Sequence, residues 1–315
     1  MNQNITLQIN ISPGDINYAL LTVPELVKKY NSITQRLLVV DCCRPQKTKI
    51  VNPDIKYPTE EFANKVSKIK EIAIELKDKC GFSEVFILES NSPIIKIISK
   101  KYLNNVYSNT HAGGGTANMS YWAAIHLPKT RYVIHLDGDM IMYSDPNYNW
   151  VTEALELLKM EKNAIFAVPR LCPPIAKNLE LPSHHEGRKF QTKENYWLND
   201  WFSTRHFLID KEKLQPFLPL ITGKIKFETL LRKWLNRVYP FDPEIVLFKK
   251  FSLHNLKRVI LKSEKTWFLH PQNKAELFNE LLPEILKEVN MGNFPEDQAG
   301  YEDLKLESWL KFLRK

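Results

Sequence analysis

Short apolar runs alternate with amphipathic stretches along the first half of the chain. Strands are predicted for the apolar runs ITLQINI (5–11), RLLVVD (36–41), EVFILE (84–89) and RYVIHLD (131–137). Apolar residues at helical spacing predict helices between them, at about 16–30, 59–79, 93–103 and soon after residue 118. Strands and helices in alternation favour right-handed crossovers and a mostly parallel central sheet.

The pattern is less regular beyond residue 150. We predict a helix at 150–161, a strand at 164–169, a loop-rich stretch at 171–198 and a strand at 200–210. Further helices are predicted at 224–238, 243–253, 274–290 and 301–313, the last two amphipathic and rich in lysine and glutamate. These features divide the chain into a regular α/β half (1–150), a second half (151–272) and a helical tail (273–315). One fused domain fits this division as well as two domains do.

The composition is that of a globular protein with an excess of positive charge. Hydrophobic residues make up 43% and aromatic residues 11% of the 315 residues, so a real core is expected. The net charge of +8 favours anionic partners such as nucleotides, phosphates or an anionic membrane, without choosing among them. Because the lysines are spread along helices and mixed with glutamate, we expect a solvated surface and no nucleic-acid partner.

Four cysteines, at positions 42, 43, 80 and 172, show no CxxC spacing. They indicate neither a disulfide framework nor a zinc knuckle, and a reducing compartment fits them best. The first ten residues lack a basic segment followed by an apolar run, and no stretch approaches the ~18 apolar residues of a membrane span. We expect a soluble, cytoplasmic protein. Peripheral contact of the basic tail with the inner face of a membrane is an open alternative.

Two aspartates, Asp137 and Asp139, close the strand at 131–137 with one glycine between them. Residues two apart in an extended strand point to the same face, so the two carboxylates can converge. Such carboxylates repel each other, and a hard divalent cation such as Mg²⁺ or Mn²⁺ removes that cost. Ligands gather at the carboxyl ends of strands in open α/β sheets. The pattern predicts a metal that holds a diphosphate, although Asp-Gly-Asp also occurs in ordinary turns.

Four segments resemble the GT-A-fold glycosyltransferases, most closely those of family 2. They are ITLQINISPGD, RLLVVDCCRP, HAGGGTANMSYWAAI and RYVIHLDGDM. The resemblance covers residues 5–150 well and 195–270 loosely. It implies a Rossmann-like three-layer α/β fold with a mostly parallel central sheet and C-terminal helices. It also implies that the first half binds a nucleotide-sugar donor and that residues 151–272 bind the acceptor.

The resemblance implies roles for individual residues. Asp41 would hydrogen-bond the nucleotide base, while Asp137 would lie near ribose and metal and Asp139 would coordinate the metal. The other donor-side residues would be Ser12, Pro13, Gly113, Gly114 and Asn118. Alternatively, Asp41 only caps a helix or turn and the glycines form only a flexible turn.

The chain departs from the family pattern at three places. The turn after Asp41 is Cys-Cys-Arg, residues 44–82 look like an inserted loop and helix, and Ala117 stands where the family has an arginine. These departures leave the nucleotide of the donor open, so either a UDP-sugar or a GDP-sugar is expected.

His270 follows an apolar stretch and resembles a late histidine that completes the metal shell in some GT-A enzymes. An imidazole ligand would favour Mn²⁺ over Mg²⁺. Alternatively, the histidine merely ends a strand beside a proline. The rival cluster His184-His185-Glu186 lacks helical spacing, so a solvated loop is expected there.

A carboxylate general base is needed because an acceptor hydroxyl is a poor nucleophile. The family places this base at a helix N-terminus shortly before the late histidine, and YPFDPEIVLFKKF (239–251) matches that arrangement. We predict Glu244 as the base, with Asp242 second and Glu228 as a weaker rival. Alternatively, Asp242 and Glu244 only complement the helix dipole.

Asp200 and Trp201 begin a segment that resembles the acceptor side of the family. Trp201 would stack on a sugar ring or belong to the core. The resemblance implies a metal-dependent, hexosyltransferase-like and inverting enzyme that transfers sugar to a glycan, lipid-linked or small-molecule hydroxyl. The alternatives are a sugar-phosphate nucleotidyltransferase and a non-catalytic relative that binds sugars or partners. Sugar-phosphate nucleotidyltransferases usually carry a glycine-rich loop with an arginine after the first strand. Here the corresponding segment, SPGDIN, has one glycine and no arginine, which counts against the first alternative.

Overall fold

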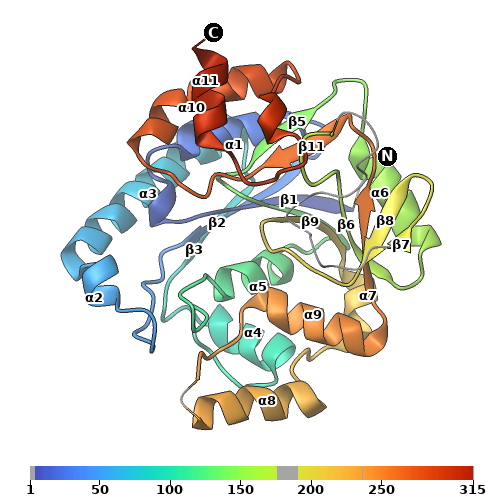
Figure 1. Ribbon diagram of the computed structural model, residues 1–315. Helices are drawn as coiled ribbons and strands as arrows, with labels where there is room; N and C mark the ends of the chain where they lie inside the picture. Colours follow the sequence, from blue (N-terminus) through green and yellow to red (C-terminus); the bar gives the residue numbers. More distant parts are fainter. Residues whose placement is uncertain (1–3, 176–190, 236, 315) are drawn as a thin grey trace.

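A central sheet organises the protein, for which the computed structural model describes residues 4–175, 191–235 and 237–314 (Figure 1). In the described part the sheet has nine strands, in the order β3-β2-β1-β4-β9-β6-β10-β8-β7. Their bounds, in that order, are Glu84–Leu88, Gln35–Asp41, Ile5–Ile11, Tyr132–Asp137, His206–Asp210, Ala164–Val168, Lys257–Leu261, Tyr196–Asn199 and Gln191–Thr192.

The strands of the first half are parallel, as the alternation of elements predicted. β1 pairs in parallel with β2 and β4, and β2 pairs in parallel with β3. The second half is mixed, because β9 runs antiparallel to both β4 and β6, and β8 runs antiparallel to β10. Among the nine described strands of this sheet, only β8 and β9 run against the others, so the predicted α/β fold with a mostly parallel sheet is confirmed. Strands of both halves share this one sheet.

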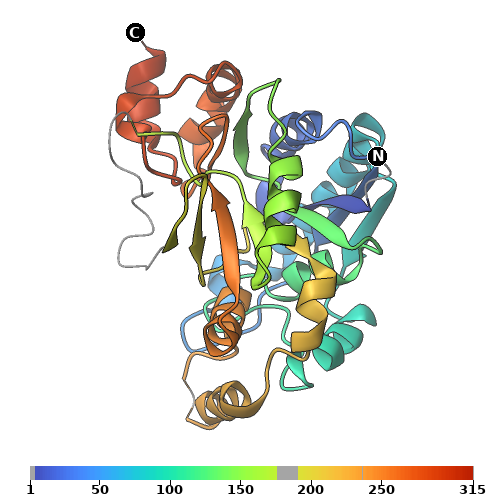
Figure 2. The same ribbon diagram turned by 90° about the vertical axis from the view of Figure 1, so that its right-hand side faces the viewer.

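Helices cover both faces of the sheet, which gives three layers (Figures 1 and 2). One face packs against α1 (Ala19–Lys28), α3 (Thr59–Cys80) and α6 (Trp150–Met160). The other face packs against α4 (Ile94–Leu103), α5 (Met119–His126) and α9 (Pro243–His254). Alternate residues of β2 enter opposite cores, as a strand covered on both faces requires: Leu38 lies in the first core and Val39 in the second.

A third, smaller core holds the tail on the body of the protein. β5 (Ile141–Ser144) pairs with β11 (Thr266–Leu269) in a two-stranded sheet, and α10 (Glu276–Asn290) and α11 (Leu306–Leu313) pack beside it. Trp309 of α11 is fully buried in this core. The tail is therefore packed by its apolar face onto the body of the protein.

The short helices α2 (Pro53–Lys56) and α7 (Lys211–Leu214) and the longer helix α8 (Gly223–Trp234) lie at the surface of the layers. α8 and the C-terminal helices lie at opposite ends of the molecule in both ribbon views (Figures 1 and 2). Within the described ranges, no helix combines the length and the apolar composition that crossing a membrane requires.

The predicted strand at 200–210 is too long. Only His206–Asp210 forms β9, because the segment before it turns aside to contact α9: Thr204 donates from its backbone N–H and its hydroxyl to Glu244, at 2.7 and 3.2 Å. The predicted helix at 224–238 likewise ends at Trp234.

Replacing Trp309 by alanine should lower the free energy of unfolding by about 3–5 kcal/mol, because it empties the centre of the third core. Chemical denaturation measures the change. Lys311→Ala, on the exposed side of the same helix, is the matched control and should have little effect. A loss below about 1 kcal/mol would mean that the tail is loosely attached.

Candidate active site

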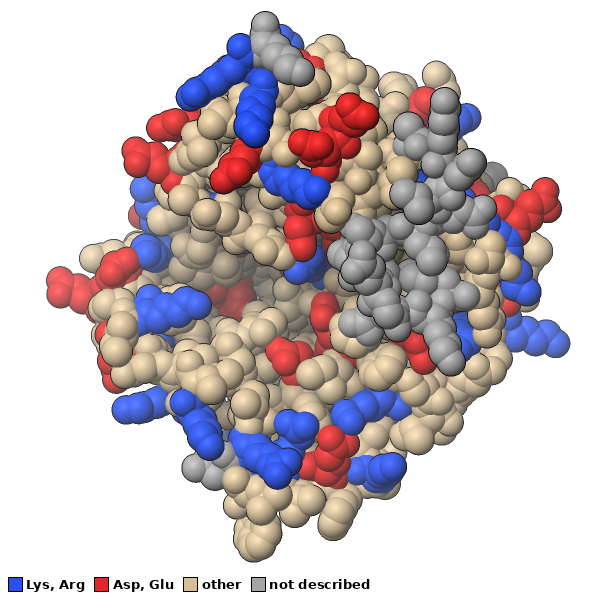
Figure 3. All heavy atoms as spheres, in the orientation of Figure 1, with Lys and Arg blue, Asp and Glu red and all other residues tan. Residues whose placement is uncertain are grey.

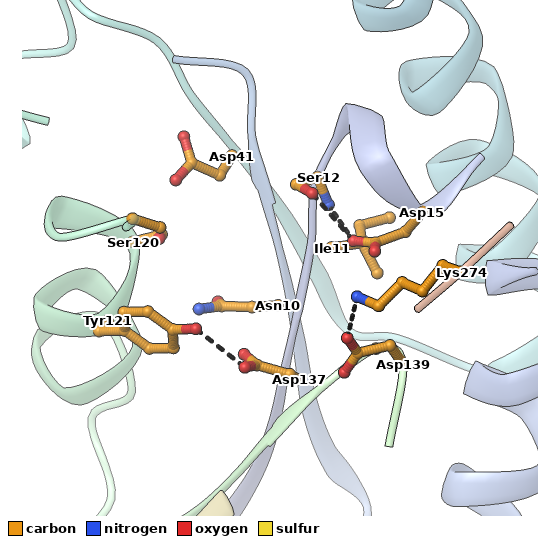
Figure 4. A pocket seen from close by; sticks show the side chains of 12 residues that line it. Asn10, Ile11, Ser12, Asp15, Asp41, Ser120, Tyr121, Asp137, Asp139 and Lys274 are labelled. Atoms are coloured by element: carbon orange, nitrogen blue, oxygen red, sulfur yellow. Dashed lines mark hydrogen bonds and ion pairs between the residues drawn. The ribbon is translucent and has the colours of Figure 1, made fainter. Parts of the chain in front are cut away.

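A cavity of about 150 Å³ opens where β1, β2 and β4 end, at the carboxyl edge of the sheet. The strand register explains the convergence, because Asn10 of β1 is level with Asp137 of β4. Four carboxylates face this cavity, those of Asp15, Asp41, Asp137 and Asp139, and Lys274 enters beside Asp15 and Asp139 (Figure 4). Lys274 is the one cationic side chain among the described residues that line it.

Asp137 is held in place by two neighbours of the sheet. Its Oδ2 accepts a hydrogen bond from the Tyr121 hydroxyl at 2.8 Å, and its Oδ1 lies 3.4 Å from His135 Nε2. Tyr121 comes from α5 and His135 from β4 itself. The carboxylate is only part-buried and keeps access to the cavity.

Asp139 forms an ion pair with Lys274, which comes from the loop after β11 (Figure 4). The Asp139 side chain is 8% exposed, so this carboxylate requires a positive partner. Burial alone would lower the pKa of Lys274, but the charges of Asp139 and Asp15 raise it above its ordinary value. The Lys274 ammonium therefore stays charged, and it also lies 5.4 Å from the centre of the Tyr18 ring.

His270 links Asp139 to the tail. Its Nε2 lies 3.6 Å from Asp139 Oδ2, and its Nδ1 lies 3.5 Å from Asp303 Oδ1. The backbone ties the same segments together, because His270 N–H donates to the Glu302 carbonyl at 2.8 Å and Leu304 N–H donates to the His270 carbonyl at 2.9 Å. An imidazole with one nitrogen on a carboxylate has its other nitrogen oriented, as is usual for metal-binding histidines.

The predicted metal ligands suit a divalent cation in kind. Asp139 Oδ1 is buried and has no hydrogen-bond partner among the described residues, and His270 Nε2 faces the same carboxylate. Carboxylate oxygens and one imidazole form a donor set that Mn²⁺ and Mg²⁺ accept. In the part of the chain that the structure describes, no three His, Cys, Asp or Glu side chains already stand together as a metal-binding group. Lys274 supplies the positive charge instead.

Asp15 also belongs to the site, although the motif ITLQINISPGD that contains it predicted roles only for Ser12 and Pro13. It lies in the 3-10 helix η1 (Pro13–Asp15), where its side chain accepts hydrogen bonds from the backbone N–H of Ser12 and from the Tyr18 hydroxyl. Burial, and next the charge of Asp139, raise the pKa of Asp15 to about 6. The capping-box spacing from Ser12 to Asp15 was a signal for its position, but its approach to Asp139 depends on the sheet.

A second cavity, of about 270 Å³, continues from the first and shares Ser12, Asp41 and Ala117 with it. Asp41 is 5% exposed and accepts a hydrogen bond from Cys43 N–H at 3.0 Å. The segment read as an insertion provides a wall of this cavity through Tyr57 and Phe62, whose rings meet edge to face. Pro13 lines it as well. The pocket therefore combines two aromatic rings with one carboxylate, and Lys56 and Lys65 line it as well.

The three glycines at positions 113–115 have different surroundings. A side chain at Gly113 would lie 2.4 Å from Tyr239 N, so this glycine allows the loop to pack on another backbone. Gly114 has no atom near the position of a Cβ, whereas Gly115 lines the second cavity. Asn118 is fully buried and accepts a hydrogen bond from Trp122 Nε1 at 2.8 Å, so its side chain holds α5.

Glu244 and Asp242 lie at the N-terminus of α9, as predicted. Asp242 occupies the N-cap position with extended backbone, but its side chain makes no capping hydrogen bond. Glu244 is held by Thr204, and burial raises its pKa above the ordinary value. Burial alone would lower the pKa of Arg205, but the charges of Glu302 and Asp303, and next those of Glu244 and Asp137, raise it above its ordinary value.

The predicted acceptor residues lie beside α9. The Ser252 hydroxyl donates to Asp200 Oδ2 at 3.2 Å, and the Trp201 ring lies 5.3 Å from the Phe248 ring. Trp201 is half-buried, which leaves part of its ring open. The rival cluster His184-His185-Glu186 lies outside the described residues.

Replacing Gly138 by alanine should destabilise the protein by about 1–3 kcal/mol, because the added methyl would lie 2.6 Å from Ile11 Cγ2 and 2.9 Å from Asn10 O. Chemical denaturation measures the loss. Gly114→Ala is the matched control, since nothing lies within 4 Å of its Cβ position. Equal stability of the two variants would contradict the tight contact between β1 and the turn after β4.

No protein-family model matches the sequence, and no curated protein matches it either. Solved structures do match it. The galactosyltransferase LgtC in complex with donor and acceptor sugar analogues is 10% identical, with a TM-score of 0.41 over 93% of this chain and 98% of that chain. UTP-bound UGPase from Acinetobacter baumannii is 10% identical, with a TM-score of 0.39 over 84% of this chain and 87% of that chain.

The mannosyltransferase Ktr4p from S. cerevisiae in complex with GDP is 13% identical, with a TM-score of 0.36 over 79% of this chain and 66% of that chain. At TM-scores below 0.5 these likenesses do not distinguish a glycosyltransferase from a UDP-glucose pyrophosphorylase. Glycosyltransferases are among the structures that this chain resembles, as its sequence motifs led us to expect.

Proposed function

We propose that this protein is a metal-dependent, inverting glycosyltransferase that uses a nucleotide-diphosphate sugar, UDP- or GDP-linked. One observation carries the proposal: a cavity lined by four carboxylates opens directly into a pocket with an aromatic wall. The two compartments have the chemistry of the two ends of such a donor. A base needs flat apolar contacts and a polar edge, and a diphosphate needs cations.

The aromatic pocket would take the nucleoside. Tyr57 and Phe62 offer flat surfaces, and Asp41 offers an acceptor for the N–H groups of a base. Ser12 and Pro13 would line the same side through the turn after β1. The base would then lie over the ends of β1 and β2, and the diphosphate would point towards Asp137 and Asp139.

The acidic cavity could not hold a diphosphate without additional positive charge. Among the described residues, Lys274 is the one cation that faces four carboxylates there, and an anionic donor would add to the repulsion. Asp137, Asp139 and His270 would hold a divalent cation, Mn²⁺ or Mg²⁺, which would compete with Lys274 for Asp139. Such a cation supplies Lewis-acid stabilisation of the departing diphosphate.

Glu244 would act as the general base for the acceptor hydroxyl. Its hydrogen bonds from Thr204 fix the carboxylate, and burial raises its pKa towards the range where a carboxylate removes a proton more effectively. The Arg205 guanidinium interacts electrostatically with both Glu244 and Asp137. Trp201 would stack on the acceptor sugar, and Asp200 would lie beside it.

Calorimetric titration with UDP and GDP, each with Mn²⁺ and with EDTA, tests the donor site. We expect one nucleotide to bind with Mn²⁺, and the binding to be lost in Asp139→Ala. The Asp139→Ala substitution removes a ligand of the cation and leaves Lys274 and His270 without their carboxylate partner. We therefore expect nucleotide affinity to fall at least about tenfold. Asp200→Ala, which leaves the cavity unchanged, should bind nucleotide normally.

Three other results would each change the proposal in a defined way. Equal binding with EDTA would show that Lys274 is a sufficient cation and that the metal is not needed. Turnover of a nucleoside triphosphate with a sugar phosphate would favour a nucleotidyltransferase. Absence of nucleotide binding under all conditions would contradict the proposal and favour a non-catalytic relative.

Glu244→Gln should lower kcat by about 10²–10⁴-fold with little change in donor affinity, because glutamine cannot accept the proton. The base works when deprotonated, so wild-type activity should fall as the pH drops towards the raised Glu244 pKa. That acidic limb should be absent from the variant. Glu228→Gln is the matched control, since Glu228 pairs with Lys249 at 2.8 Å on the surface. Full activity of Glu244→Gln would eliminate it as the base.

A further inference from the structure

Helix α8 turns its apolar face outwards. Phe227 and Trp234 are 68% and 80% exposed, and Leu230 and Leu231 between them are exposed as well. These positions recur at the three- and four-residue spacing of one helix face. The apolar stripe continues past the helix end with Leu235. Large apolar side chains gathered in this way indicate a surface that meets another apolar phase.

The opposite side of α8 buries only two residues. Ile225 and Thr229 are its buried residues, and the Thr229 hydroxyl is spent on the helix itself through a hydrogen bond to the Ile225 carbonyl at 2.7 Å. A helix of a water-soluble surface normally buries its larger apolar side chains and exposes polar ones. α8 does the reverse, so burial in the body of the protein does not account for its sequence.

Positive charge surrounds the stripe. Residues 223–238 contain five basic residues and one acidic residue, Glu228. Glu228 is neutralised by Lys249 at 2.8 Å and by Arg232 at 3.6 Å. Lys and Arg side chains gather at this end of the molecule, where α8 lies, below the central hollow (Figure 3). An apolar helix face with basic flanks is typical of helices that lie in a membrane interface.

A basic cavity lies against the end of the helix. It has a volume of about 230 Å³, and its lining includes Lys47, Lys49, Lys233 and Arg237 but no acidic residue among the described ones. His111 lines both this cavity and the proposed nucleoside pocket, so the two adjoin. A cavity with four cations and no carboxylate suits a phosphate group.

We propose that α8 docks the protein on an anionic lipid bilayer, with its apolar stripe in the interface and the basic cavity over lipid phosphates. Charge decides between this occupant and a second copy of the chain. Two copies meeting at α8 would bring like charges together, whereas an anionic bilayer complements them. The tail, suggested by its sequence as the membrane contact, buries its apolar face in the third core instead.

Docking at α8 would bring the basic cavity and the adjoining pocket to the membrane surface, where a lipid-linked acceptor is found. The docking itself does not depend on the proposed activity. It can be measured without nucleotide or metal, so failure of one proposal leaves the other open to its own test.

Co-sedimentation with vesicles tests the docking. We expect the wild type to sediment with vesicles of phosphatidylcholine and phosphatidylglycerol in equal parts, weakly with phosphatidylcholine alone, and less as salt is added. The double variant Phe227→Ser/Trp234→Ser should lose at least about tenfold in partitioning, because the apolar anchors are gone. Lys224→Gln and Lys226→Gln should each lower partitioning about fivefold on the anionic vesicles.

The matched control is Ile74→Ser/Met160→Ser, which removes two equally exposed apolar residues from α3 and α6. It should partition like the wild type. Wild-type partitioning by Phe227→Ser/Trp234→Ser, or none by the wild type on anionic vesicles, would overturn the proposal. So would a concentration-dependent dimer that this double variant abolishes, since a second copy would then cover α8.

Discussion

Repulsion among carboxylates at one edge of the sheet is the constraint that determines the rest of the site. Asp15, Asp137 and Asp139 are brought together by the ends of β1 and β4, and two of them are nearly buried. Such a cluster is stable only with a cation at its centre. Lys274 provides one, and it reaches Asp139 from a segment more than a hundred residues away in the sequence. The same shortage of positive charge makes the cavity attractive to a divalent ion.

The tail belongs to the site as much as to the third core. Asp303 lies on His270, and Glu302 forms charge interactions with Arg205, whose guanidinium also interacts with Glu244. The packing of α10 and α11 thereby sets the orientation of an imidazole at the cavity. Stability of the C-terminal helices and geometry of the site are thus coupled through a short stretch of backbone, the bridge between His270 and Asp303.

The two ends of the molecule differ in how their helices place apolar side chains. At one end, apolar residues of α10 and α11 are buried, and at the other, those of α8 are exposed (Figure 1). The basic cavity adjoins the nucleoside pocket on the α8 side. Docking at α8 would therefore bring a bilayer next to the proposed nucleoside pocket.

Local sequence determined the parallel half of the sheet and the place of Asp41, Asp137 and Asp139, because apolar runs define strands and the residue that ends a strand lies at the sheet edge. It also placed Asp242 and Pro243 at the start of α9. Tertiary structure alone decided that Lys274, Asp15 and Asp303 join the site, since their partners come from distant segments. It also decided the outward face of α8. Helical spacing shows that a face is apolar, and only packing shows which way it turns.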